Sequence, residues 1–297
     1  MLAGALLDLD KFASQIDSLR DVSFGVNLFL PDDPSGADVD AYARTLAPWF
    51  DRYDVVPGEM PRRDDHYRQK FAWLVEHPVP LVTSTFGTFE AAEVEALHAV
   101  GTEVWCTITS AGEARQADSA GVDALVVQGP EAGGHRGSFD GSAPEASLID
   151  LLTEVRSASD LPRIAAGGLM DGNDVAALVD SGAAHAAQLG TAFLNTPEAG
   201  TRPVHREQLT ATSTTQVTRA FSGRPARGLV NEFMLAHSSV APLAYPDVHY
   251  LTAPMRAKAG AAGDSSALSM WAGTGHLRTR QAPVSELMAE WAEQLGR

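Results

Sequence analysis

The chain has 297 residues, of which 44% are hydrophobic and 20% are charged, and its formal net charge at pH 7 is −16. This length and composition are typical of a globular protein with a sizeable hydrophobic core. The negative charge disfavours binding to nucleic acid or to anionic lipid, because both require clustered lysine and arginine.

The cellular setting is predicted from cysteine usage and from apolar runs. Cys106 is the single cysteine, so no intramolecular disulfide can form, which is typical of a reducing compartment. The apolar run at the N-terminus is short and is interrupted by Asp8, unlike a secretory signal. No run of about 18 apolar residues occurs. We therefore expect a cytoplasmic protein without a membrane or nucleic-acid partner.

Seven short apolar runs predict buried β-strands, of which the first is the weakest. Six of them are almost continuously apolar, as expected for parallel strands that are covered on both faces. The seven runs are 2–7, 24–29, 79–85, 102–108, 123–128, 163–168 and 184–190.

Segments with helical periodicity lie between these runs. Residues 10–20 and 88–101 carry apolar side chains at helical spacing, and similar patterns return at 253–263 and 284–296. Three times a glycine stands between a helical segment and the next strand, which is a common way to end a helix. Repeated helix–glycine–strand units predict a parallel β/α sheet. A closed barrel of this type needs eight strands, and we count seven.

The composition changes after residue 195, where threonine, arginine, glycine and proline become frequent and no strand-like apolar run is seen. We predict a small, irregular substrate-side domain at residues 198–255, inserted into the barrel. The barrel itself is then formed by residues 1–197 and 256–297.

Two successive predicted strands end in glycine. The first ends in Gly167 and Gly168, and the second in Gly190 followed by Thr191. Glycine lets backbone N–H groups approach an anion closely, and β/α barrels commonly bind cofactor phosphates at this position. The alternative is that these glycines only form tight turns, but two such pairs in consecutive units favour a phosphate site.

The segment 128–137, with sequence QGPEAGGHRG, follows the preceding strand and should lie at the mouth of the same barrel. Gly133 and Gly134 would allow the backbone to approach a flat ring. His135 has a side chain that titrates near neutral pH. The alternative is an exposed histidine on a glycine-rich surface loop, and the neighbouring phosphate site favours a functional role.

Five segments together resemble one protein family over essentially the whole chain. They are 25–29, 128–137, 165–172, 188–193 and 269–274. The chain resembles the nitronate monooxygenases, formerly called 2-nitropropane dioxygenases, which are FMN-dependent (β/α)8 barrels. That family opens with a further strand and turn. The resemblance therefore implies an α/β, TIM-type barrel that lacks its first β/α unit.

The resemblance implies a reaction and a set of site residues. The expected enzyme is an FMN-dependent oxidoreductase that uses O2 to oxidise alkyl nitronates or nitroalkanes to a carbonyl compound and nitrite. His135 would act as the base on the carbon next to the nitro group, and no metal is expected. The residues implicated in binding FMN are Asn27, Gln128, Gly133, Gly134, Gly167, Gly168, Gln188, Leu189, Gly190, Thr191, Trp271 and Gly273.

Two alternative functions remain open from the sequence. One is an NAD(P)H-dependent quinone reductase or enoyl-thioester reductase on the same flavin barrel. The other is a non-catalytic protein that binds flavin or phosphate. A missing β/α unit would leave strand edges unpaired, and unpaired edges favour pairing with another chain, so a homodimer is one option for the assembly.

Overall fold

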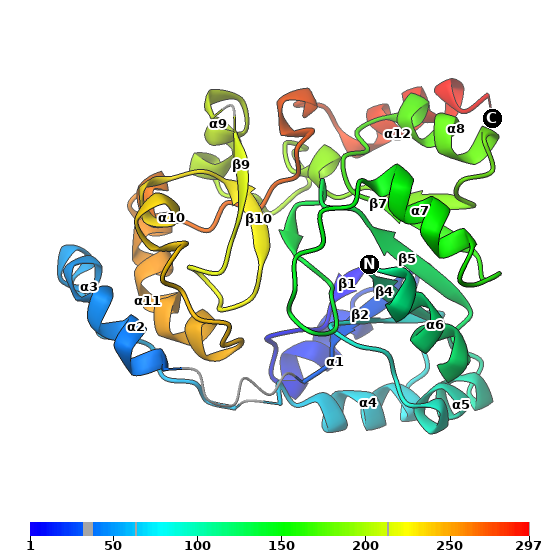
Figure 1. Ribbon diagram of the computed structural model, residues 1–297, viewed down its shortest axis with the longest axis horizontal. Coiled ribbons are helices and arrows are strands. Elements are labelled where there is room, and N and C mark those ends of the chain that lie inside the picture. The colour runs from blue at the N-terminus through cyan, green and yellow to red at the C-terminus, as the bar shows by residue number, and fades with distance from the viewer. Residues whose placement is uncertain (32–37, 63, 213, 297) are drawn as a thin grey trace.

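Seven parallel strands form the main sheet of the computed structural model, which describes residues 1–31, 38–62, 64–212 and 214–296 (Figure 1). Their order is β1-β2-β3-β4-β5-β7-β8, and each neighbouring pair is parallel. Each predicted run contains one of them, so the prediction of a seven-stranded TIM-type β/α barrel sheet is confirmed. The strands are β1 (Leu2–Ala3), β2 (Gly25–Phe29), β3 (Leu81–Thr85), β4 (Glu103–Ile108), β5 (Ala124–Gln128), β7 (Arg163–Ala166) and β8 (Ala186–Gln188).

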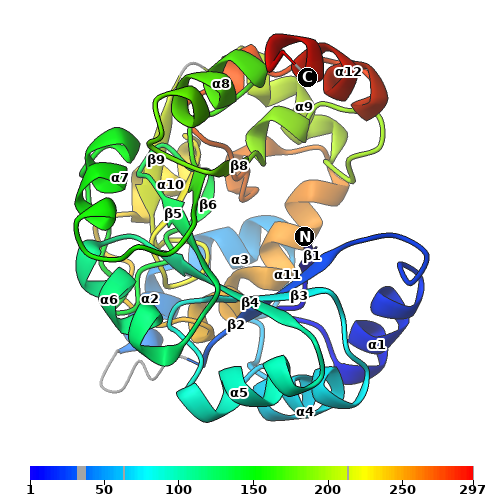
Figure 2. The same ribbon diagram turned by 90° about the vertical axis from the view of Figure 1, so that its right-hand side faces the viewer.

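Helices lie around the outside of this sheet (Figure 2). Four of them begin at an N-cap side chain that accepts a backbone N–H of the first turn, a contact worth about 1 kcal/mol. These caps are Asp8, Ser110, Ser147 and Asp171. The helices are α1 (Leu9–Asp17), α4 (Tyr67–Glu76), α5 (Ala91–Ala99), α6 (Ala111–Ala120), α7 (Leu148–Arg156), α8 (Gly172–Asp180) and α12 (Val284–Gln294).

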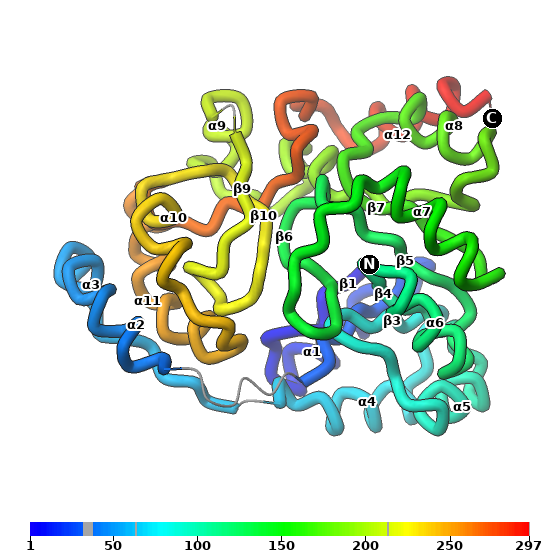
Figure 3. The backbone as a smooth tube through the Cα atoms, in the orientation of Figure 1, coloured from blue at the N-terminus to red at the C-terminus, as the bar shows by residue number. Residues whose placement is uncertain are grey.

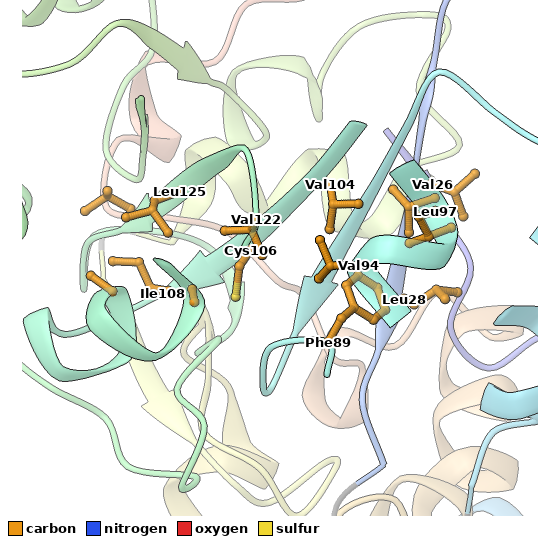
Figure 4. Packing of buried hydrophobic residues seen from close by; sticks show 14 of the residues in the cluster. Val26, Leu28, Phe89, Val94, Leu97, Val104, Cys106, Ile108, Val122 and Leu125 are labelled. Carbon is orange, nitrogen blue, oxygen red and sulfur yellow. The ribbon is translucent and has the colours of Figure 1, made fainter. Parts of the chain in front are cut away.

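The main hydrophobic core fills the space between the strands and these helices. Val26 of β2 and Val104 of β4 are buried with Val94 and Leu97 of α5, as Figure 4 shows. Cys106 belongs to the same core, and burial raises the pKa of its thiol to about 12. The cysteine is therefore a packing residue rather than a nucleophile.

A second hydrophobic core lies to one side of the barrel, in the left-hand part of Figure 1. It unites α2 (Val39–Thr45) and α3 (Ala47–Tyr53) with α10 (Glu232–His237) and α11 (Asp247–Ala261). We call these four helices, with the strands β9 (Thr215–Thr218) and β10 (Ala226–Leu229), the second lobe. The sequence did not indicate that residues 39–53 pack with a region about 200 positions away, because such packing leaves no local pattern.

A small antiparallel sheet joins the second lobe to the barrel. Its order is β6-β10-β9, formed by β6 (Gly134–His135), β10 (Ala226–Leu229) and β9 (Thr215–Thr218). Figure 3 shows β6 beside β10. The expectation that the region after residue 195 contains no strand is wrong, because β9 and β10 are four residues long and too short to form an apolar run. Pairing between them and the burial of Leu229 stabilise this sheet.

The remaining elements complete the chain between the lobes. They are α9 (Pro203–Ala211) and the 3-10 turns η1 (Thr191–Phe193), η2 (Ser265–Ala267) and η3 (His276–Arg278). The predicted helix at 253–263 starts earlier, since α11 begins at Asp247 and continues through Pro254. The domain boundaries at residues 198 and 255 remain a prediction, and α11 extends across the second of them. Within the described ranges, no helix has the length and apolar character needed to cross a membrane.

Candidate active site

A cavity of about 290 Å³ opens at the carboxyl ends of the barrel strands, where β/α barrels place their functional residues. Every strand of the main sheet contributes to its wall, together with the loops that follow β5, β7 and β8. The predicted site residues that line it are Asn27, Gln128, Gly133, His135, Gly167, Gly168, Gln188, Gly190, Thr191 and Gly273.

Three predicted residues lie beside this wall rather than in it. Gly134 pairs with Arg227 across the small sheet and has a φ of +78°. Leu189 packs into a separate apolar cluster that contains Met170 and residues of α12. Trp271 lies with its ring centroid 5.6 Å from that of His135. Their predicted roles in binding a cofactor remain predictions.

One end of the cavity is built from glycine backbone. Gly167 has a φ of +117°, and a Cβ there would lie 2.9 Å from the backbone nitrogen of Ala132. A Cβ on Gly273 would lie 2.5 Å from the carbonyl oxygen of Glu131. The backbone N–H of Gly273 donates to Thr191 Oγ1 at 2.9 Å. These close approaches require glycine and draw four loops together.

The same end offers unused donors. In the part of the chain that the structure describes, the backbone N–H groups of Gly168, Gly190 and Thr191 donate to no protein acceptor. A Cβ on Gly190 would meet no atom within 4 Å, so this backbone faces open space. Free backbone N–H groups that line the same cavity can serve as an anion site. We call residues Gly167, Gly168, Gly190 and Thr191 the glycine end of the cavity.

Asn27 lies on the wall of the cavity that β2 and β3 form. Its Oδ1 accepts hydrogen bonds from Thr83 Oγ1 at 2.7 Å and from Thr85 Oγ1 at 2.9 Å. Thr85 in turn lies 3.3 Å from Thr107 Oγ1 on β4. Because both threonines hold the carbonyl oxygen, the Asn27 amide NH2 is left to donate into the cavity.

Gln128 at the end of β5 fixes the glycine-rich loop. Its Nε2 donates to the carbonyl oxygen of His135 at 2.9 Å, and its Oε1 accepts from the backbone N–H of Gly137 at 2.8 Å. One amide hydrogen remains for a ligand, because the NH2 group carries two. The side chain therefore shapes the cavity and still lines it.

His135 lines another part of the cavity wall. Its Nε2 lies 2.9 Å from Ser222 Oγ, and Ser222 is itself buried. Four aromatic rings enclose the imidazole at centroid distances of 5.6 to 6.1 Å. They belong to Phe29, Phe86, Tyr245 and Trp271.

The surroundings of His135 keep its imidazole neutral. Burial among these rings lowers its pKa to about 3, and the positive charges of Arg224 and Arg256 contribute to the shift. A neutral imidazole at pH 7 can accept a proton. The glycine-rich loop thus presents a base to the cavity rather than an exposed, titrating histidine.

Arg256 supplies a positive charge close to His135. Its Nε donates to Thr252 Oγ1 at 3.0 Å, and its Nη2 donates to the carbonyl oxygen of His249 at 2.7 Å. Burial lowers the pKa of Arg256 to about 10, so it stays protonated at pH 7. Within the described residues it forms no ion pair with a carboxylate. A half-buried cation of this kind attracts an anionic ligand. We call His135 of the cavity wall, together with the neighbouring Ser222 and Arg256, the histidine end.

Sequence reasoning missed the residues that support the predicted ones. Thr83 and Thr85 belong to three consecutive hydroxyl residues at the end of an otherwise apolar run, and this change could have indicated a polar wall. Ser222 is 87 positions from His135, and Arg256 lies on a helix predicted only in part. No local pattern connects these two residues with the loop. The described residues hold no group of three or more histidine, cysteine, aspartate or glutamate side chains placed to bind a metal.

Comparisons with known proteins agree on one group. The family model described as nitronate monooxygenase matches residues 1–294. A nitronate monooxygenase of Pseudomonas aeruginosa is 35% identical over 95% of this chain and 84% of its own length. A probable nitronate monooxygenase of Staphylococcus aureus is 30% identical over 99% of this chain and 86% of its own length.

Solved structures of similar proteins share the fold. The nitroalkane oxidase from Streptomyces ansochromogenes is 42% identical, with a TM-score of 0.94 over 99% of this chain and 87% of that one. FabK from Thermotoga maritima is 26% identical, with a TM-score of 0.71 over 97% of this chain and 81% of that one.

Proposed function

The chain belongs to the nitronate monooxygenase family, and on this premise we propose that it binds FMN and uses O2 to oxidise alkyl nitronates and nitroalkanes to a carbonyl compound and nitrite. The observation that carries the proposal is one cavity lined both by glycine backbone with unused N–H donors and by a neutral imidazole. A flavin phosphate and a nitroalkane are complementary to these two ends.

The residues present fit a flavin mononucleotide. Free N–H groups of Gly168, Gly190 and Thr191 suit its phosphate, and the Asn27 amide suits the carbonyl groups of its ring. One glycine end serves one phosphate group, which favours FMN over FAD. When bound, FMN would supply the redox chemistry that takes electrons from the nitronate and passes them to O2.

His135 accounts for the use of a neutral nitroalkane. Such a substrate must lose a carbon-bound proton to become a nitronate, and a positioned neutral imidazole suits that transfer. The Ser222 hydroxyl donates to the carbonyl oxygen of Arg224 at 3.2 Å, so it accepts from the Nε2–H of His135. This tautomer leaves the basic lone pair on Nδ1.

Arg256 would stabilise the anion that this step creates. The proton moves onto His135, whose cationic form is disfavoured by the nearby arginines. A nitronate beside the imidazolium offsets this repulsion, because its negative charge faces two positive ones. A substrate supplied as the nitronate needs no proton transfer, so the positive charge of Arg256 would contribute only to its binding.

The absorption spectrum of the purified protein tests the proposal. We expect a yellow protein that releases FMN on heating, and anaerobic addition of an alkyl nitronate should bleach the flavin band. Bleaching by NADH but not by a nitronate would instead support the quinone or enoyl-thioester reductase. A colourless protein that binds no added FMN would overturn the proposal. The cytoplasmic location and the homodimer remain predictions.

A further inference from the structure

Arg136 is a buried arginine next to His135 whose guanidinium bonds only to backbone. Its side chain is 1% exposed. Nη2 donates to the carbonyl oxygen of Gln128 at 3.0 Å, and Nη1 donates to that of Gly129. Its Nε has no acceptor within the described part of the chain. Arg136 thus connects the residue after β6 to the end of β5. No carboxylate of the described residues accepts a hydrogen bond from its guanidinium.

Other bonds close the same point of the loop. Gln128 Nε2 donates to the carbonyl oxygen of His135, and the backbone N–H of Gly137 donates to Gln128 Oε1. The term "loop neck" denotes residues 128–129 and 135–137, which these contacts hold together. His135 is part of the loop neck, so its backbone position depends on these contacts.

A purely space-filling role does not explain the choice of side chain. Burial lowers the pKa of Arg136 to about 10, and the nearby positive charge of Arg227 adds to this shift. Desolvating a charge is costly, and an apolar side chain would fill the same space without that cost. A planar guanidinium can donate to two carbonyl groups at once in a fixed geometry, and an apolar side chain cannot.

We propose that Arg136 is a positioning residue that sets the place of the His135 imidazole in the cavity. His135 ends β6 and lines the cavity. The guanidinium of the next residue, Arg136, is buried against the carbonyl groups of Gln128 and Gly129. The inference rests on the proposed function, in which His135 accepts the substrate proton. A base displaced by about 1 Å can lose about 100-fold in rate.

Replacing the guanidinium by shorter or differently shaped donors tests the proposal. Arg136→Lys keeps the charge but cannot bond both carbonyls in the same plane, and Arg136→Gln keeps a donor without the charge. We expect each to lower kcat/KM for a neutral nitroalkane about 10- to 100-fold, and that for the preformed nitronate much less. Retained FMN content would show that the cavity survives.

Arg163→Lys is the matched control. Arg163 is also buried, and its Nε donates to the carbonyl oxygen of Ala183. It begins β7, whereas the cavity is lined by the last residue of that strand. This variant should lose comparable stability and keep the wild-type ratio of the two activities. If it changes the ratio as much as Arg136→Lys, the proposal is overturned.

A double-mutant cycle separates positioning from general damage. In a His135→Asn background, Arg136→Lys should lower the nitroalkane activity little further, because there is no longer a base to misplace. Multiplied losses in the double variant would mean that Arg136 acts independently of His135, and equal losses on both substrates would likewise overturn the proposal.

An NMR titration of the histidine rings provides a readout that does not need turnover. In Arg136→Lys, we expect the pKa of His135 to rise from its low value, because a displaced ring is more hydrated and farther from Arg256. An unchanged His135 pKa would overturn the inference. If the wild-type protein oxidises neither substrate, the proposed function fails, while this titration still decides the role of Arg136.

Discussion

The two ends of the cavity are built in different ways. The glycine end consists of backbone from Gly167, Gly168 and Gly190, and its geometry follows directly from the ends of β7 and β8. The histidine end consists of side chains from the loop after β5, from the segment before β10 and from α11. Binding of a phosphate can thus depend on local turns, while the reactive group depends on contacts distant in sequence.

The largest expected effect comes from removing the base. His135→Asn should lower turnover of a neutral nitroalkane by about 100- to 10,000-fold, the usual value of a positioned general base. Turnover of a preformed nitronate should fall less, since its proton is already gone. Flavin content should stay unchanged, because the glycine end is untouched. Steady-state rates on both substrates measure this, and equal losses would contradict the role of His135 as base.

The next largest effect should appear at the other end. Gly167→Ala forces a side chain into a φ of +117° and towards the Ala132 nitrogen. We expect FMN affinity to fall about 100-fold, because the backbone of the glycine end must shift to make room for the new methyl group. Fluorescence titration of the apoprotein measures this affinity. Gly101→Ala is the control, since its φ is +82° but a Cβ meets nothing within 4 Å. An equal loss of FMN affinity in the two variants would show that backbone strain, rather than the shape of the glycine end, lowers the affinity.

A smaller effect should follow the loss of the unpaired cation. Arg256→Met should raise KM for a nitronate about tenfold, the value of one hydrogen bond to a charged group. Arg52→Met is the control, because Arg52 is more exposed and pairs with Asp264. No change in KM for Arg256→Met would exclude this arginine from anion binding.

Arg256→Met should also change the pH dependence of nitroalkane turnover. In the wild-type protein, nitroalkane turnover should be lost only as the pH falls through the His135 pKa of about 3, because the protonated ring cannot accept a proton. Removing the positive charge of Arg256 raises that pKa, so the loss should begin at a higher pH. A pH profile of kcat/KM measures the shift, and a profile displaced to lower pH would contradict it.

The smallest effect on FMN affinity is expected at Thr85, on the part of the cavity wall that β2 and β3 form. Thr85→Val removes one of the two hydroxyl groups that hold Asn27 Oδ1. Thr83 keeps the other bond, so FMN affinity should fall only about fivefold, as for one neutral hydrogen bond of about 1 kcal/mol. Titration of the apoprotein measures it. A loss as large as that in Gly167→Ala would mean that the wall, rather than the glycine end, dominates binding.

This contrast also explains what the sequence could predict. Most of β5 and β7 is apolar, and Gly167 and Gly168 follow β7 directly, so local pattern predicts that they lie at the end of that strand. Ser222 and Arg256 carry no such pattern, because their roles arise when β10 and α11 pack beside the loop. The small sheet was missed because its strands are too short to form an apolar run. Leu189 lies inside a matching motif and packs against an apolar cluster, and its role in binding stays a prediction.

The uncompensated charge of Arg256 has a kinetic consequence. The whole chain carries a formal net charge of −16, so its long-range field repels an approaching nitronate. The attraction of Arg256 acts only at short range, inside the screening length of about 8 Å at physiological ionic strength. Added salt therefore speeds the arrival of the anion by weakening the outer repulsion. It does much less to the retention of the anion, because a half-buried charge is poorly screened.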